Sequence, residues 1–277
     1  PGEFIKQQPV AEKQKTTERK MTFDGDYTGR EEVSATTAAG EKTAKILFRD
    51  KAEFNFDTMA HSIRGLKVGK DQASLRYATE GNLPSGEGTL ETTFAGEWAG
   101  NDDKMHVLAQ SGPSNAEGVG KFYIYKFKKN GIAAYFELNK TGEKLFLNYN
   151  AKDWKPDEWH HVLVSYSPEK IDFYVDGVLR KSGKLSEIKT WPSVFTVGPA
   201  YDKLGRDAVT TIANFTIYDK AVNPQEAAAI AKRRLPQLNL AVETAAPDGN
   251  AVILDPSPWF KDRPKVAMEA LADDTVP

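Results

Sequence analysis

The chain has 277 residues, which suits one or two domains and is enough to bury a hydrophobic core without covalent staples. Its 37 basic and 39 acidic residues give a formal net charge of −2, so no field is expected that would capture nucleic acid or anionic lipid. The lack of cysteine excludes disulfides, thiolate nucleophiles and sulfur-ligated zinc, and it favours a bacterial cytosolic or exported protein. The apolar runs are too short to insert a helix into a membrane.

Residues 1–20 are predicted to be a cloning remnant followed by a flexible arm. The opening letters PGEF are typical of a tag scar, and a native signal peptide would have been removed with the natural start. The stretch that follows has too few apolar residues to offset the entropy of ordering it. Residues 22–45 stay polar and rich in Gly and Thr, with short possible strands. A core is expected from Ile46-Leu47-Phe48 onward.

The middle of the chain alternates between strands and turns. Asn130-Gly131 separates two strand-like runs and is a strong hairpin signal, because both residues tolerate positive φ. Asp176-Gly177 gives an equally clear second hairpin. Predicted strands occupy residues 88–94, 121–128, 132–138, 160–165, 171–175, 194–197 and 213–218.

One helix is predicted after these strands. Asn223 is its N-cap, Pro224 its first residue, Glu226 supports its positive end, and Pro236 is expected to end it. Hairpins with a single late helix predict an all-β, antiparallel two-sheet jelly-roll sandwich. We assign this sandwich to residues 21–235. Residues 236–277 are rich in proline and are interpreted as an irregular tail or the start of a following domain.

A longer pattern resembles a known family. Residues 158–177, EWHHVLVSYSPEKIDFYVDG, resemble the core of laminin-G-like, concanavalin A-like jelly rolls. The likeness extends from GTLE at 88–91 to AVNPQE at 221–226 and covers roughly residues 46–232. It implies the jelly-roll fold and a secreted, periplasmic or cell-surface protein. The family holds lectins, carbohydrate-binding modules, adhesion modules, glycosidases and lyases, so the fold does not select an activity.

The sequence contains no recognisable catalytic motif. Glycosidases of this fold carry E-x-D-x-x-E on one strand face, and that spacing is absent. The nearest run, Glu169 to Asp172, is interpreted as solvated charge at a strand end. His160 and His161 are strand neighbours that point to opposite faces, so they cannot share one metal. We interpret them as one structural and one exposed histidine.

Calcium is the one ion that the sequence suggests. The letters DGDYTG at 24–29 resemble the first half of a calcium-binding loop, with Asp24 and Asp26 as candidate ligands. The twelfth position is Ala35, which lacks the bidentate carboxylate of such loops, so a polar turn is the favoured interpretation. Where the family often places a calcium-binding acid, this chain has Ala213.

Three predicted loops combine aromatic rings with polar side chains, the composition of a sugar site. Core packing is an equally good interpretation for Trp98 and Trp154, and the better one for Trp159 and Trp191. A second aromatic group, Tyr123, Tyr125 and Phe127, lies on one face of a predicted strand and could pave a concave sheet. The candidate ligand-binding residues of the loops are Trp98, Asn101, Asp102, Trp154, Tyr201, Asp202 and Arg206.

Three functions are compatible with these features. We rank first a non-catalytic glycan-binding module, for instance an accessory domain of an exported bacterial multidomain glycosidase or adhesin. A protein-interaction, adhesion or spacer module ranks second. A glycoside hydrolase or polysaccharide lyase with unfamiliar acids, such as Glu91, Glu137 or Asp172, ranks third. The expected partner is therefore a glycan or polysaccharide, together with further domains of the same parent chain.

Overall fold

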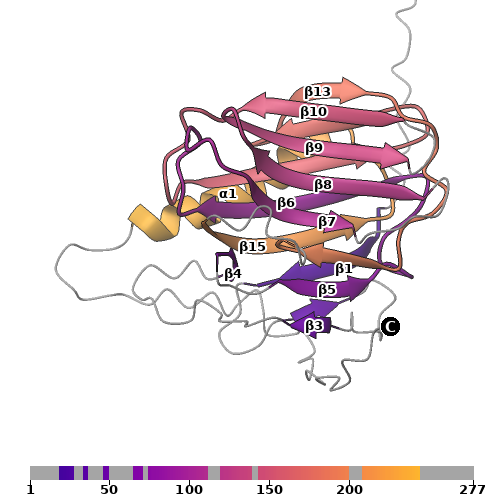
Figure 1. Ribbon diagram of the computed structural model, residues 1–277, viewed down its shortest axis with the longest axis horizontal. Coiled ribbons are helices and arrows are strands. Elements are labelled where there is room, and N and C mark those ends of the chain that lie inside the picture. The colour runs from indigo at the N-terminus through magenta and orange to yellow at the C-terminus, as the bar shows by residue number, and fades with distance from the viewer. Residues whose placement is uncertain are drawn as a thin grey trace, which may run out of the picture.

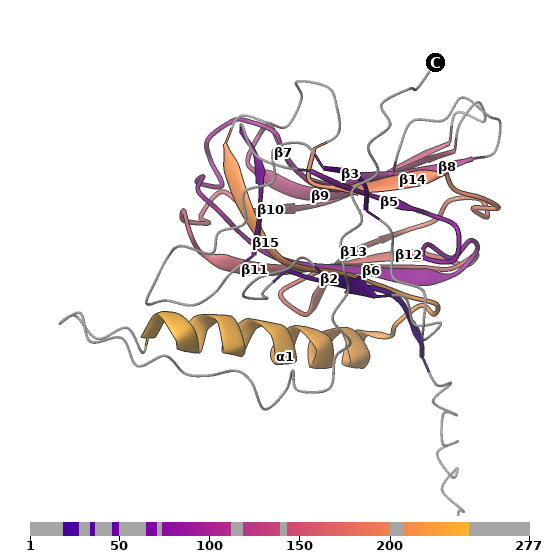
Figure 2. The ribbon, with the colours of Figure 1, turned by 90° about the horizontal axis from the view of Figure 1, so that it is seen from below.

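The computed structural model describes residues 19–27, 34–36, 46–49, 65–70, 74–111, 119–138, 143–199 and 208–243. In these residues two β-sheets stack face to face, and a helix, α1 (Pro224–Glu243), lies against the outer side of one of them (Figure 2). This is the antiparallel jelly-roll sandwich that the sequence predicts. Within the described part of the chain, no helix is long and apolar enough to cross a membrane.

The sheet next to the helix, called sheet A, has eight strands, and β4 (Leu66–Gly69) joins it by pairing with β15. The other seven strands of sheet A follow the order β13 (Val178–Gly183), β12 (Ile171–Val175), β11 (Trp159–Tyr166), β6 (Gly88–Gly96), β15 (Val209–Tyr218), β1 (Met21–Asp26) and β2 (Ser34–Thr36).

The second sheet, called sheet B, has seven strands (Figure 1). Every strand pair within the two sheets is antiparallel. The order in sheet B is β10 (Lys144–Asn150), β9 (Gly131–Leu138), β8 (Gly120–Phe127), β7 (His106–Ser111), β14 (Val194–Val197), β5 (Leu75–Ala78) and β3 (Ile46–Arg49).

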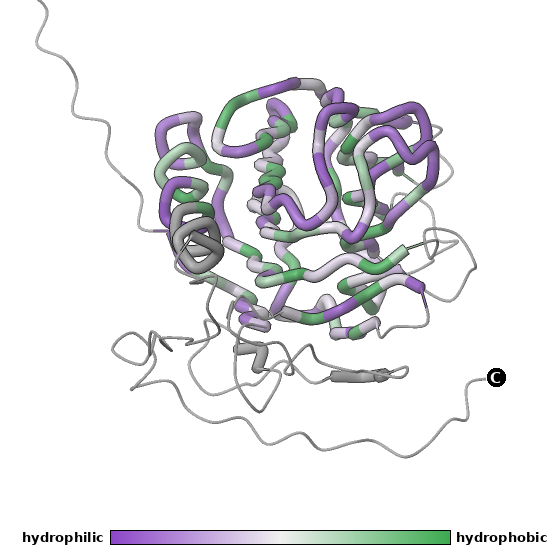
Figure 3. The backbone as a smooth tube through the Cα atoms, turned by 90° about the vertical axis from the view of Figure 1, so that its left-hand side faces the viewer, coloured by the Kyte–Doolittle hydropathy of each residue, from purple (hydrophilic) through white to green (hydrophobic). Residues whose placement is uncertain are grey.

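The core lies between the two sheets, because alternate residues of each strand point inward. Hydrophilic and hydrophobic residues follow one another at short intervals along the strands (Figure 3). In β8 this alternation is complete, with every second residue buried. Sheet A contributes the fully buried rings of Phe94, Phe173 and Phe215, and sheet B contributes Phe122 and Phe136.

The two hairpins differ in how well the sequence predicts them. Asp176 and Gly177 have φ of 52° and 76°, as the predicted two-residue turn requires. The first hairpin closes one residue earlier than predicted, because Lys129 and Asn130 take positive φ, at 67° and 66°. Gly131 instead begins β9, and its lack of a side chain serves packing and not a turn.

The helix begins as predicted and continues further than predicted. Asn223 Oδ1 accepts a hydrogen bond from the Glu226 amide at 2.9 Å, and Glu226 Oε2 accepts one from the Asn223 amide at 3.0 Å. This reciprocal pair caps the first turn. The prediction that Pro236 ends α1 is wrong, since the helix runs on to Glu243. A proline removes a single backbone hydrogen bond, and here the helical turns resume beyond it.

Two further expectations need correction near the strand starts. Strand β1 begins at Met21 and pairs along its length with β15. Asp24 and Asp26 therefore sit in a strand and not in the predicted polar turn. Trp159, predicted to be core, is only partly buried at the start of β11, whereas Trp191 is 7% exposed and packs inside as expected.

Candidate functional site

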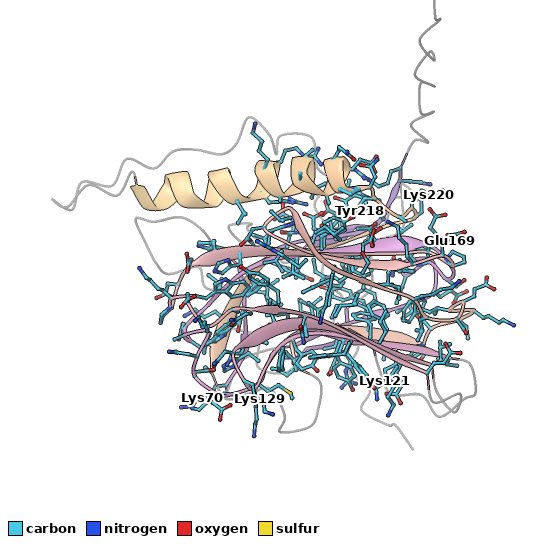
Figure 4. The ribbon with its side chains drawn as sticks, turned by 90° about the horizontal axis from the view of Figure 1, so that it is seen from above. Lys70, Lys121, Lys129, Glu169, Tyr218 and Lys220 are labelled. Atoms are coloured by element: carbon cyan, nitrogen blue, oxygen red, sulfur yellow. The ribbon has the colours of Figure 1, made fainter. Side chains whose placement is uncertain are left out.

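The outer face of sheet A is closed by α1. Leu163 and Tyr174 of the sheet pack against Val222, Ala227 and Ile230 on and before the helix, and all five are buried. Figure 4 shows Tyr218 on this side, next to the helix, and Lys121 on the opposite side of the molecule, beyond sheet B. The outward side chains of sheet A under α1 are thus in contact with protein and not with solvent.

A buried carboxylate, Glu91, lies in the middle of this covered face. It is 0% exposed and accepts hydrogen bonds from Arg234 Nε and from the Tyr218 hydroxyl, both at 2.7 Å. His161 Nε2 lies 3.5 Å from Glu91 Oε1. Burial alone would raise the pKa of Glu91, but Arg234 and His161 outweigh it and hold the pKa well below its usual range. The cluster ties α1 to sheet A.

Two polar groups on sheet A are more buried than predicted. Asp172, predicted to be solvated, is 1% exposed and accepts hydrogen bonds from Ser182 at 2.6 Å and Tyr174 at 3.3 Å. The two neighbouring histidines do point to opposite faces, but neither is exposed, since His160 is 7% and His161 0% accessible. The expectation of one exposed histidine fails because α1 covers the outer face.

The structure brings four of the predicted loop residues together at one end of the sandwich. The loop of residues 97–105 and the loop of residues 151–158 are joined by the Gly100 amide, which donates to the Trp154 carbonyl at 3.0 Å. The Asp157 amide donates to the Gly96 carbonyl at 2.7 Å. These links hold Trp98, Asn101, Asp102 and Trp154 on neighbouring loops.

The two tryptophans of these loops differ in how far their rings are packed against other protein side chains. Trp98 is 5% exposed, donates its indole N–H to Thr210 Oγ1 at 2.8 Å and stacks on His106, with centroids 4.7 Å apart. Core packing, the alternative for this residue, accounts for all of these contacts. Trp154 is partly exposed and stacks one face on His160, with centroids 3.6 Å apart and planes 11° apart. At most its other face is available to a ligand.

Of the polar candidate residues at this end of the sandwich, Asp102 already binds other side chains of the protein. Asn101 is exposed. Asp102 Oδ2 lies 2.6 Å from His106 Nε2, and its other oxygen accepts from the buried Lys126 ammonium. Burial would raise the pKa of Asp102, but its bonds to Lys126 and His106 lower it below the ordinary value. The remaining ligand-binding candidates, Tyr201, Asp202 and Arg206, lie outside the described residues.

The calcium candidates are in a mixed environment. Asp24 is 9% exposed and accepts a hydrogen bond from Thr216 Oγ1 at 3.2 Å, on the face that α1 covers. Asp26 is partly buried at the end of the same strand. Among the described residues, no three His, Asp or Glu side chains gather in a way that could hold a metal ion. Calcium binding stays a prediction.

Sheet B presents a different outer face. Five aromatic side chains from three adjacent strands point outward, and we call them the aromatic platform: Tyr123, Tyr125 and Phe127 of β8, Tyr135 of β9 and Phe146 of β10. Strand register explains the grouping, since Tyr123 pairs with Tyr135 and Tyr135 pairs with Phe146. Phe146 is 39% exposed, and the other four are partly exposed. The prediction that three rings share one face of β8 is confirmed.

The rings of the platform lie close together over small residues. Adjacent centroids are 6.3 Å apart from Tyr123 to Tyr125 and from Tyr125 to Phe127, and 5.1 Å apart from Phe127 to Phe146. A Cβ added to Gly131 would lie 2.1 Å from Phe127 Cε1, so the ring rests on the bare backbone of β9. Neighbouring rings are inclined by 54° to 75°, and the platform is therefore faceted and not flat.

Charged and polar groups border the platform at one end. Glu137 lies between Lys121 and Lys144, with an N–O distance of 3.8 Å to each. The Tyr135 hydroxyl donates to Glu137 Oε2 at 2.8 Å. Burial and this carboxylate together raise the pKa of Tyr135 well above its usual range, so the phenol stays a neutral donor. Asn148 on β10 accepts from Lys181 at 3.1 Å.

The sequence contains further signals for this platform besides the three rings of β8. Tyr135 and Phe146 alternate with inward residues at a spacing of two, as do the three rings of β8. The hairpin signal predicted that β8 and β9 are neighbours, but the sequence did not place β10 beside β9. Only when β8, β9 and β10 are adjacent do the rings become one surface.

A comparison with protein families identifies the class to which this architecture belongs. The family model of the concanavalin A-like lectin/glucanases superfamily matches residues 71–228, more than half of the chain. The chain belongs to this superfamily. No curated protein matches the sequence.

Solved structures resemble the chain in fold. The binding domain of botulinum neurotoxin serotype D aligns with a TM-score of 0.61 at 11% identity, covering 78% of this chain and 52% of that one. The binding domain of botulinum neurotoxin DC in complex with SialylT gives 0.60 at 13%, covering 77% and 51%. The serotype D ligand-binding domain in complex with N-acetylneuraminic acid gives 0.60 at 11%, covering 78% and 51%. The chain spans about half the length of these structures, and identities this low show the fold alone.

Proposed function

We propose that the protein is a non-catalytic glycan-binding module that uses the aromatic platform of sheet B. The observation that carries the proposal is the group of five outward aromatic rings on three adjacent strands. Sugar rings have apolar C–H faces that pack on aromatic rings, while their hydroxyls need hydrogen-bonding partners at the edges. The platform combines both, because Glu137, Asn148 and two lysines lie beside the rings.

The geometry also favours a particular form of ligand. Crystalline polysaccharide presents a plane, which suits rings that are coplanar. The inclinations of 54° to 75° between neighbouring rings suit a single, soluble chain whose successive sugars can turn. The loop residues Asn101 and Trp154 lie at one end of the sandwich and would extend the contact for a longer chain.

The family and the related structures support this proposal. The superfamily description includes lectins, and two of the structures similar in fold are complexes, one with SialylT and one with N-acetylneuraminic acid. We propose further that the module is exported and serves as an accessory domain of a bacterial multidomain glycosidase or adhesin. The acids named for an enzyme on this fold give less support, because Glu91 and Asp172 are buried among protein partners.

A glycan array tests the proposal directly. The full chain is applied with and without calcium, and hits are measured by calorimetry against Tyr125→Ala and, as a matched control on the opposite side of the molecule, Tyr218→Phe. We expect binding that Tyr125→Ala weakens about tenfold and Tyr218→Phe preserves. If no glycan binds, or if binding is the same in Tyr125→Ala, the platform is not a glycan site. A protein partner that binds the platform and resists competition by sugars would favour the adhesion alternative.

A further inference from the structure

The aromatic platform carries an uneven set of charges at its border. The outward charged side chains of β8, β9 and β10 are Lys121, Glu137 and Lys144, two cations and one anion. A third cation, Lys181, reaches Asn148 from the neighbouring edge of sheet A. The protein as a whole has a net charge of −2, so this local excess of positive charge runs against the overall balance.

The two lysines that flank Glu137 are held loosely. Each ammonium lies 3.8 Å from a different oxygen of the carboxylate, which is an ion-pair distance and longer than a hydrogen bond. Their side chains are 29% and 59% exposed, whereas that of Glu137 is 23% exposed. An exposed pair of this kind is weak, so a ligand anion can compete for both ammonium groups. Lys121 also lies over the Tyr123 ring, 5.3 Å from its centroid, which places its charge at the edge of the ring cluster.

We propose that the platform selects acidic glycans, with a carboxylate or sulfate of the sugar placed between Lys121 and Lys144. This inference rests on the glycan-binding function proposed above and names its ligand class. The rings supply the stacking surface that any sugar would use. The lysines supply long-range attraction and charge-assisted hydrogen bonds that only an anionic sugar uses. Glu137 then acts as a built-in competitor that keeps the lysines in place when no ligand is bound.

Paired ligands test the charge preference separately from sugar binding. Sialyllactose is compared with lactose, oligogalacturonate with oligogalactose, and sulfated with unsulfated lactose, by calorimetry on the full chain. We expect at least one acidic member to bind roughly fivefold more tightly than its neutral partner at low salt. The advantage should shrink in 1 M salt, where the screening length is about 3 Å. The pair that shows the preference distinguishes a carboxylate from a sulfate.

Charge variants sharpen the result. Replacing both lysines, Lys121→Gln with Lys144→Gln, should bring the acidic-to-neutral ratio of affinities close to one, because it removes the positive charges that distinguish the two ligands. Glu137→Gln keeps an acceptor for Tyr135 and should raise affinity for the acidic member about twofold to fivefold, because it removes the competing anion. Lys232→Gln, an exposed site on α1, is the matched control and should change nothing.

The two proposals fail in different ways. Equal affinity for acidic and neutral partners, or an acidic preference that survives the double lysine replacement, overturns the charge inference and leaves glycan binding standing. A complete lack of binding, or binding indifferent to Tyr125→Ala, overturns the proposed function itself.

Discussion

The outer faces of the two sheets arise from the same strand alternation and end in opposite environments. On sheet A the outward residues lie beneath α1, where Leu163 and Tyr174 are fully buried and Glu91 is held by Arg234. On β8 to β10 of sheet B, five of the outward side chains are aromatic and at least partly exposed. An outward position therefore does not define a surface residue. What covers the position decides whether it serves stability or recognition.

The largest expected effect is on the covered face. Arg234→Ala leaves the fully buried Glu91 carboxylate without its cation, which we expect to cost about 3 kcal/mol of the free energy of unfolding. In a domain of this size that lowers the melting temperature by about 10 °C. Calorimetric or spectroscopic melting measures the change, and glycan binding at low temperature should be intact.

A companion variant separates the lost ion pair from lost packing. Arg234→Met together with Glu91→Gln removes both charges and keeps most of the volume, and it should recover part of the stability lost in Arg234→Ala. If the stability losses of Arg234→Met and Glu91→Gln simply add up in the double variant, Arg234 contributes by packing and not by its ion pair with Glu91.

The next effect is on the aromatic platform of sheet B. Tyr125→Ala removes the central ring of β8, which contacts Tyr123 and Phe127 on either side. We expect affinity for the best glycan to fall about tenfold, a typical loss for an aromatic side chain at the centre of a binding surface. Stability should change much less than in Arg234→Ala, because the ring is partly exposed. A binding loss matched by a loss of fold, seen by circular dichroism, would contradict the separation of the two faces.

A smaller effect is expected from the floor of the platform. Gly131→Ala places a methyl group where the Phe127 ring lies, although the φ of Gly131 is not in the left-handed region. The ring must move, and we expect about 1 kcal/mol of destabilisation with a loss of a few-fold in glycan affinity. In a Phe127→Leu background the same substitution should be nearly neutral, which a double-mutant cycle measures.

The last effect is the response of the covered face to acid. The pKa of Glu91 is lowered in the folded protein, so its stabilisation is full above the unfolded pKa of about 4.3 and is lost as the pH falls toward the folded value. Melting temperatures measured from about pH 6 to about pH 2 should fall more steeply for the wild type than for Glu91→Gln. Parallel curves would mean that Glu91 is not the carboxylate that matters.

Local sequence signals predicted a large part of the fold. The Asp176-Gly177 turn, the Asn223–Glu226 cap and the shared face of Tyr123, Tyr125 and Phe127 depend on residues within a few positions of one another. The pattern of residues 158–177 placed the chain in its family for the same reason.

The errors about exposure share a different cause, because each concerns what packs against a residue. Trp98 offers its ring to His106 and Thr210, and Asp172 is closed off by Ser182 and Tyr174. His161 is fully buried on the face of sheet A that α1 covers. Local patterns do not reveal such contacts, because they form only when strands and loops pack together; Trp98 and Thr210, for example, are 112 positions apart in the sequence.

The sequence by itself determined the strands, the turns, the helix start and the family, because these follow from the spacing of side chains along a short stretch of backbone. Only the tertiary structure decided that β10 lies beside β9 and that α1 covers sheet A and leaves the platform open. The physical reason is that exposure depends on contacts between residues far apart in the chain. Strand order and helix docking set those contacts, and neither is encoded in any single segment.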